Sequence, residues 1–245
     1  MRFWRFWAFV AAGLLVVAGG YGVLAISRPP PPSGLTYMPL GDSITQGGRR
    51  TGGYRCPLQA KLVDAGYDAS AVGLSGFLNR WTVTDCPDYW EGHGSYMTAE
   101  IRAWFNADNS ITQLKPHVIL AMVGTVDARR GNISQGPNDL RNMLNDIFIQ
   151  SPNSWVILST IPPLGSQVKF FDQVIGYNKA IMSGAAEFPR VSTIDFYTAG
   201  NNIITACLTD DGIHLMPAGY DVLTPLWFHA IRSIGAGMAE INKPK

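Results

Sequence analysis

Two kinds of apolar pattern alternate along the chain. Runs of six or seven mostly apolar residues, such as 117–123, are typical of strands that are buried on both faces of a sheet. Between these runs, apolar side chains recur every three or four residues, as at Leu140, Met143, Leu144 and Ile147, which indicates amphipathic helices. The predicted strands are 35–40, 69–74, 117–123, 155–161 and 191–196, and the predicted helices are 54–65, 97–105, 137–149, 173–188 and 218–238.

This alternation of strands and helices predicts an α/β protein with a parallel sheet and helices on both faces. We find no internal repeat and expect one domain over residues 36–240. In such a sheet, ligands bind at the carboxyl ends of the strands. The residues that follow the predicted strands, 41–45, 73–76 and 124–127, are therefore the places to look for chemistry.

The apolar stretch 6–26 stands outside this pattern. It contains 21 uncharged residues, whereas a spanning helix needs about 20 and the apolar core of a cleaved signal has about 7–15. Its length favours a retained signal anchor, although Val23-Leu24-Ala25 could serve as a cleavage site. We expect residues 1–28 to be a signal anchor or signal peptide, and residues 29–35 to be a Pro-rich linker.

Arg2 and Arg5 precede the apolar stretch, so the positive-inside rule keeps the N-terminus in the cytosol and exports the rest. We therefore expect a single-pass membrane protein held through residues 6–26, with an extracellular or luminal domain. If the segment is cleaved, the protein is secreted.

The composition excludes several classes of function. Apolar residues make up 47% of the chain, which supports a sizeable core, and the net charge is +1. The charges are interspersed without a basic stripe, so we expect no nucleic-acid partner. No Cys/His spacing is typical of a metal site, and we expect a monomer without a metal or other cofactor.

Export makes disulfides and glycosylation possible. Among the three cysteines we favour a Cys56–Cys86 pair, because Cys86 lies in a polar loop with little else to fix it. Cys207 would then be free, although a bridge to it stays open. Asn132-Ile133-Ser134 is the only glycosylation sequon, so Asn132 is a candidate for modification.

A serine follows the first predicted strand, in Gly41-Asp42-Ser43. A serine hydroxyl is a weak nucleophile and needs a base that a third group orients. Asp211 and His214 supply such a pair far downstream, three residues apart. Ser43 alone could be a helix N-cap and His214 alone a structural histidine, but their combination favours nucleophilic catalysis with His214 as base.

Together these motifs resemble the SGNH (GDSL-type) hydrolase superfamily. The matching blocks are 41–45, Gly73, 124–127 in part, and 211–214. Residues 38–45, 53–55, 91–94 and Gly219-Tyr220 resemble carbohydrate esterase family three, whose members include acetyl xylan esterases. The resemblance implies a flavodoxin-like three-layer α/β/α sandwich, and hydrolysis of acetyl esters on carbohydrate through an acyl-serine.

The resemblance also implies an oxyanion hole built from the backbone N–H groups of Ser43 and Gly73. Val126, however, stands where the family has an asparagine that supplies a third donor. Losing one such donor typically lowers kcat by about 10²–10³-fold. The chain could be a slow esterase, could recruit Thr125 or Asn79 as a donor, or could be a catalytically impaired glycan-binding protein. A lysophospholipase or general lipase-like esterase is a further alternative.

Other polar and aromatic residues near these blocks are candidates for binding substrate. Each also has a structural interpretation: a brace for the turn, packing within a loop, or a solvated surface position. The pairs Arg49-Arg50 and Arg129-Arg130 follow two of the blocks and could form a rim that attracts anionic substrates such as uronate-bearing glycans. The candidates are Asp42, Thr125, His93, Arg50 and Arg129, with Trp81 and Trp90 as possible sugar-stacking residues.

Overall fold

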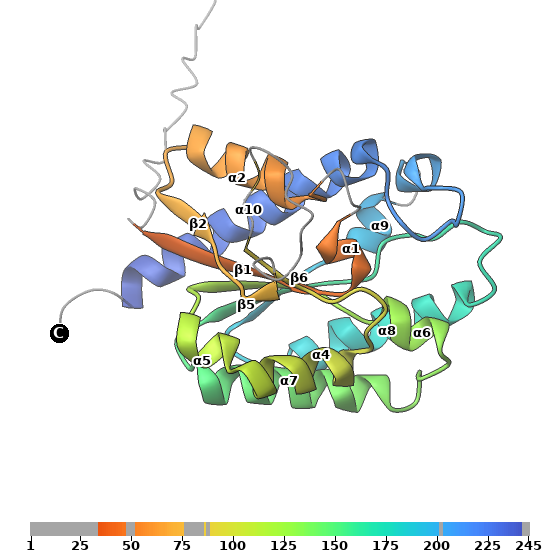
Figure 1. The fold of residues 1–245 in the computed structure, drawn as a ribbon, viewed down its shortest axis with the longest axis horizontal. Helices are drawn as coiled ribbons and strands as arrows, with labels where there is room; N and C mark the ends of the chain where they lie inside the picture. The colour runs from red at the N-terminus through yellow and green to blue at the C-terminus, as the bar shows by residue number, and fades with distance from the viewer. Residues whose placement is uncertain (1–33, 48–51, 76–85, 87–88, 201–202, 242–245) are drawn as a thin grey trace, which may run out of the picture.

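A computed structural model of the chain describes residues 34–47, 52–75, 86, 89–200 and 203–241. The expected anchor or signal, most of the linker, Arg50, Asn79 and Trp81 lie outside these residues. Within them, a six-stranded parallel sheet lies between two layers of helices (Figure 1). The predicted α/β sandwich is therefore confirmed. In the described ranges, no helix has both the length and the apolarity needed to cross a membrane.

The sheet has the strand order β2-β1-β4-β5-β6, and β3 also pairs with β1. β2 pairs with the first half of β1 and β3 with its last two residues, so the two share one edge of β1. β4 occupies the other edge, which makes the end of β1 the point where the strand order reverses. The strands are β1 (Leu35–Gly41), β2 (Ala69–Ala71), β3 (Glu91–Gly92), β4 (Val118–Met122), β5 (Trp155–Ser159) and β6 (Val191–Ile194).

Alternate residues of the buried strands supply two separate cores. Leu120 of β4 belongs to the core beneath α2 (Arg55–Asp64), α9 (Phe196–Gly200) and α10 (Pro217–Ile241). Its neighbour Ile119 belongs to the core on the opposite face. That face is covered by α4 (Thr98–Asp108), α5 (Ser110–Leu114), α7 (Gly136–Gln150) and α8 (Phe171–Ala185). The continuous apolar runs thus reflect strands that are buried on both sides.

Several short elements were not predicted. They are β3, α6 (Thr125–Arg129), α5, α9 and the 3₁₀ helix η1 (Ile204–Cys207); the helix start expected at Ser43 is that of α1 (Ser43–Gln46). Each is too short to show a hydrophobic period. The strand predicted over 69–74 also ends early, at Ala71. The residues after Val72 turn away from β1 and hydrogen-bond to Trp90 and Glu91 instead.

A disulfide joins Cys56 of α2 to Cys86, as predicted, across a separation of 30 residues. Cys207 is a free thiol. The bridge fastens Cys86 to a helix that packs against α10 and one face of the sheet. It therefore ties Cys86, which lies between β2 and β3 in the sequence, to the fold.

Candidate active site

The nucleophile candidate lies where β1 gives way to α1. β1 ends at Gly41, and α1 begins at Ser43. Asp42 caps the short helix, since its Oδ1 accepts a hydrogen bond of 3.0 Å from the backbone N–H of Ile44. This turn presents the half-buried Ser43 at the carboxyl edge of the sheet, at the reversal of strand order.

Ser43 is in hydrogen-bond contact with His214. The distance from Ser43 Oγ to His214 Nε2 is 2.8 Å, and that from His214 Nδ1 to Asp211 Oδ2 is 2.6 Å. An ionised carboxylate only accepts hydrogen bonds, so Nδ1 carries the proton that it donates to Asp211. The lone pair of Nε2 is then free to accept the Ser43 hydroxyl proton, and the three side chains form a connected Ser–His–Asp triad.

The loop that carries His214 is held by Asp211 itself. Asp211 Oδ1 accepts hydrogen bonds from the N–H groups of Ile213 (2.8 Å) and His214 (2.9 Å) and from the Thr209 hydroxyl (2.8 Å). Gly212 adopts a left-handed φ of 69° within this turn. Sequence reasoning did not identify Thr209, because its role depends on the folded turn.

These contacts keep Asp211 ionised. Partial burial raises its pKa, but the hydrogen bonds from the His214 ring, from two backbone N–H groups and from Thr209 outweigh that effect. The pKa of Asp211 is therefore held well below its ordinary value. A carboxylate that stays charged can orient the imidazole and stabilise the imidazolium that forms during proton transfer.

Asp42, by contrast, is fully buried. Burial raises its pKa to about 6, although the Ile44 N–H, the nearby Thr125 hydroxyl and the His214 ring each favour the charged form. The Thr125 hydroxyl lies near the carboxylate without reaching hydrogen-bond geometry. These contacts fit a brace for the turn, one of the two roles that the sequence left open for Asp42.

Gly73 lies against the backbone of Trp90. A Cβ atom at this position would come within 2.3 Å of the Trp90 carbonyl carbon, so no side chain fits. Two residues further on, the backbone N–H of Ser75 donates to the Trp90 carbonyl oxygen at 3.1 Å. The turn of residues 73–75 is thereby held against β3, at the same edge of the sheet as Ser43.

Position 126 of the third predicted block supplies no side-chain donor to this edge. Val126 lies in the first turn of α6, is buried and carries no polar atom. The Thr125 hydroxyl, one of two alternative donors considered, is buried beside Asp42. Asn79, the other, lies outside the described residues.

His93 and Trp90 are both buried. The exposed fraction of His93 is 8%, and its ring packs against Tyr96 and Trp104. Trp90 is 3% exposed and lies beneath the Arg55 guanidinium, 3.7 Å from the ring centre. Of the two roles that the sequence left open for these residues, burial favours packing over contact with a sugar.

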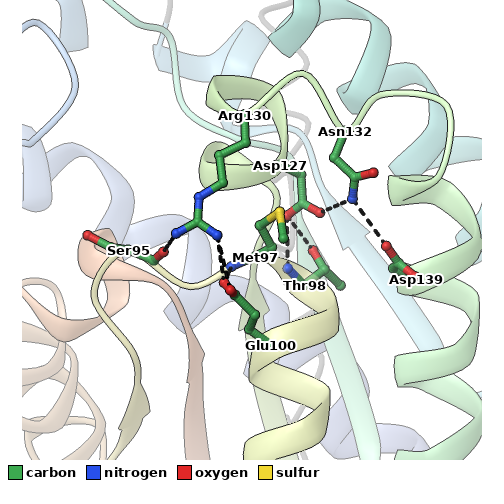
Figure 2. A network of polar contacts seen from close by, with 8 residues as sticks. All are labelled: Ser95, Met97, Thr98, Glu100, Asp127, Arg130, Asn132 and Asp139. Atoms are coloured by element: carbon green, nitrogen blue, oxygen red, sulfur yellow. Dashed lines mark hydrogen bonds and ion pairs between the residues drawn. The ribbon is translucent and has the colours of Figure 1, made fainter.

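The arginine pair Arg129-Arg130 lies at the C-terminal end of α6. Figure 2 shows Arg130 bound to the Glu100 carboxylate and to the Ser95 carbonyl oxygen, at 3.0 Å each. Arg129 is exposed. Arg50 lies outside the described residues, and the rim of arginines stays a prediction.

Asn132, the candidate for glycosylation, uses its amide group inside the same network. Its Nδ2 donates to Asp127 Oδ1 and to Asp139 Oδ2, at 3.2 Å each (Figure 2). A glycan on this nitrogen would replace one of the two hydrogens. Modification at Asn132 would therefore break one of the contacts that hold α6 to α7.

Comparison with known proteins gives concordant results. The sequence profile of the GDSL-like lipase/acylhydrolase family matches residues 40–222. A multidomain esterase of Ruminococcus flavefaciens is 28% identical over 219 residues, which are 80% of this chain but only 28% of that protein. The chain thus spans little more than a quarter of that relative.

Two solved structures share the fold. A carbohydrate esterase family 3 protein from Talaromyces cellulolyticus superimposes with a TM-score of 0.68 at 21% identity, covering 83% of this chain and 99% of that one. A family 3 carbohydrate esterase of Clostridium thermocellum gives 0.67 at 24% identity, covering 82% and 99%. With a family profile that covers most of its length, the chain belongs to the GDSL-like lipase/acylhydrolase family, which supports ester hydrolysis as its reaction.

Proposed function

We propose that this protein is a serine esterase that removes acetyl groups from carbohydrate through an acyl-Ser43 intermediate. The observation that carries the proposal is the continuous hydrogen-bonded path from Ser43 through His214 to Asp211 at the carboxyl edge of the sheet. Such a path activates a hydroxyl as a nucleophile without a cofactor.

The reaction has two steps. Ser43 Oγ attacks the ester carbonyl carbon as its proton passes to His214 Nε2, and the C=O electron pair moves to the oxygen. When this tetrahedral intermediate collapses, the bond to the alcohol breaks and His214 returns the proton to the alcohol. Water then attacks the acyl-serine with His214 again as base, releasing acetate and restoring the Ser43 hydroxyl.

The oxyanion of both steps would be met by the backbone N–H groups of Ser43 and Gly73. Without an asparagine at position 126 we expect one donor fewer than in an SGNH enzyme with the full motif. A missing donor is worth about 2.7–4 kcal/mol of transition-state stabilisation. That magnitude slows a serine esterase without abolishing its mechanism.

The exposure of the triad supports a bulky, water-soluble substrate. The side chains of His214 and Asp211 are 41% and 47% exposed, so the reacting centre is open to solvent. An acetyl group on a polysaccharide can reach such a centre. The similarity to proteins named carbohydrate esterases favours the same substrate class.

We also propose that the catalytic domain, residues 36–240, acts outside the cytosol. The Cys56–Cys86 disulfide supports an oxidising compartment. Residues 1–28 would serve as the signal anchor or cleaved signal peptide.

Burst kinetics with p-nitrophenyl acetate test the reaction. We expect a burst of p-nitrophenol that Ser43→Ala abolishes and that Ser233→Ala leaves unchanged, because the Ser233 hydroxyl only bonds within its own helix. A folded wild-type protein that releases p-nitrophenol no faster than Ser43→Ala would favour the glycan-binding alternative.

The choice of substrate separates the two esterase alternatives. Acetate esters should react faster than long-chain esters, and acetylated xylan should release acetate. Preference for a long acyl chain would favour the lipase-like alternative and contradict the proposed substrate.

A further inference from the structure

Glu91 is a fully buried carboxylate that the proposed mechanism leaves without a role. It lies in β3, within the block 91–94. Carboxylates are rarely buried unless hydrogen bonds satisfy them. Three groups contact this one: the backbone N–H of Leu74, the Ser75 hydroxyl at 3.0 Å and the His93 ring nitrogen Nε2 at 3.1 Å.

Two of these contacts belong to the turn that begins at Gly73. β2 ends at Ala71, and the Val72 N–H still donates to β1, at the Tyr37 carbonyl oxygen. Beyond Val72, the N–H of Leu74 donates to the Glu91 carboxylate, and the N–H of Ser75 donates to the Trp90 carbonyl oxygen. The turn is thus held by β3 rather than by the strand that precedes it.

β3 is in turn fastened beside the nucleophile. Glu91 pairs with Leu40 and Gly92 with Gly41, two residues before Ser43. The N–H of His93 donates to the Gly41 carbonyl oxygen at 2.8 Å. Gly92 also lies against the backbone of Gln46 in α1. One continuous set of contacts therefore runs from α1 through β3 and Glu91 to the turn after Gly73.

We propose that Glu91 is a positioning residue of the oxyanion hole, whose buried carboxylate holds the turn at Leu74 and Ser75 so that the Gly73 N–H faces the substrate oxygen. This inference rests on the proposed esterase function. It makes Glu91 necessary for the placement of one of only two backbone donors. A shift of the turn by a fraction of an ångström would then weaken the oxyanion contact.

Glu91→Gln removes the charge with little change of volume. The amide keeps one acceptor oxygen but directs an NH₂ group at donors that formerly met a carboxylate oxygen. We expect the rate constant for acylation of Ser43 to fall about 10–100-fold, less than the about 10²–10³-fold loss for removing a donor outright. The apparent dissociation constant of the substrate should change less than threefold, because the bound ester does not depend on the oxyanion contact.

Two matched variants distinguish a local effect on the oxyanion hole from a general loss of stability. Ser75→Ala removes a hydroxyl that donates to the buried Glu91. Thr98→Val removes a hydroxyl that donates to the buried Asp127 (Figure 2), over a distance of 2.9 Å. Asp127 also accepts from the Thr98 N–H at 2.9 Å, as Glu91 accepts from the Leu74 N–H. Thr98 and Asp127, at the start of α4, thus make the same type of buried contact as Ser75 and Glu91.

The test measures the acylation rate constant for p-nitrophenyl acetate in the full-length protein by stopped flow, alongside the melting temperature. We expect slower acylation in Glu91→Gln and, to a smaller extent, in Ser75→Ala. Thr98→Val should keep the wild-type rate within about twofold despite a similar fall in melting temperature.

The outcomes separate this inference from the proposed function. If the wild type acylates and Ser75→Ala and Glu91→Gln acylate at its rate, the role of Glu91 is overturned while the esterase stands. An equal loss of rate in Thr98→Val would also overturn it. If Glu91→Gln does not fold, the comparison of Ser75→Ala with Thr98→Val decides. A wild type that forms no acyl-enzyme refutes the esterase itself, and the inference falls with it.

Discussion

Ser43 Oγ lies 2.8 Å from His214 Nε2, although 171 residues separate the two in sequence. The first helical turn after His214 secures this contact. Tyr220, in α10, donates its hydroxyl to the Ile44 carbonyl oxygen at 3.0 Å, and so joins the start of α10 to the helix that begins with Ser43. The same chain segment thus carries the base and the contact that sets its distance from the nucleophile.

Replacing Asp211 should reverse the tautomer of His214. In Asp211→Asn, the amide can donate to Nδ1, which leaves the proton on Nε2, where it cannot accept from Ser43. We expect kcat for p-nitrophenyl acetate to fall by about 10⁴-fold. Asp210→Asn, one residue away and exposed, is the control and should retain activity. A loss under tenfold in Asp211→Asn would contradict the assigned role.

Restoring an amide at position 126 should accelerate the reaction. Val126→Asn places a donor where SGNH enzymes carry one, and we expect kcat to rise at least tenfold. The upper limit is the gain in kcat from one well-placed donor, which is about 10²–10³-fold. Val126→Ala creates space without a donor and serves as the control in the same steady-state assay. An equal gain in both variants, or none in Val126→Asn, would show that the oxyanion hole is built differently.

Asp42 should make stability depend on pH. Its pKa rises from 3.8 to about 6 in the folded state, so folding favours the protonated carboxyl. The resulting stabilisation is present below about pH 4 and is lost as the pH rises through about 6. The whole effect amounts to about 3 kcal/mol.

Asp42→Asn should remove this dependence while its amide oxygen still caps Ile44. Relative to the wild type, the variant should gain about 2–3 kcal/mol in free energy of unfolding between pH 4 and pH 8. Urea unfolding of both proteins at the two pH values measures the difference. Parallel curves with no relative gain would mean that Asp42 is not the titrating group.

The disulfide should contribute substantially to stability. Cys56 and Cys86 close a loop across 30 residues, which corresponds to about 3–4 kcal/mol in the chain-entropy description. Cys56→Ser combined with Cys86→Ser should lower the free energy of unfolding by that amount, and Cys207→Ser should change it much less. If the double variant were as stable as the wild type, the loop would have to be fixed by other contacts.

Periodicity predicted the long elements because burial decides them. The runs at 117–123 and 155–161 became β4 and β5, each buried on both faces. β3 escaped prediction, since its two residues are too few to show a period and their strand character comes from pairing with β1. The end of β2 was misplaced for the same reason, because the partner of the turn after Gly73 is a distant segment.

The sequence likewise revealed some residues of the site and not others. Ser43, Asp211 and His214 could be found from the sequence, since a triad needs those residue types and Asp211 reaches His214 within one turn. The contact of Glu91 with Leu74 could not, because it joins residues that are 17 positions apart in the sequence. An acidic residue between Trp90 and Gly92 was the available signal, but its burial is a property of the fold.

Peptide mapping of the acyl-enzyme tests the central claim most directly. The full-length protein is mixed with p-nitrophenyl acetate, quenched with acid during the burst, digested and analysed by mass spectrometry. We predict one acetyl group on the peptide that contains Ser43, localised to that side chain, and its absence in His214→Ala quenched at the same time. An acetyl group on another residue during turnover, with Ser43 unmodified, would contradict the account.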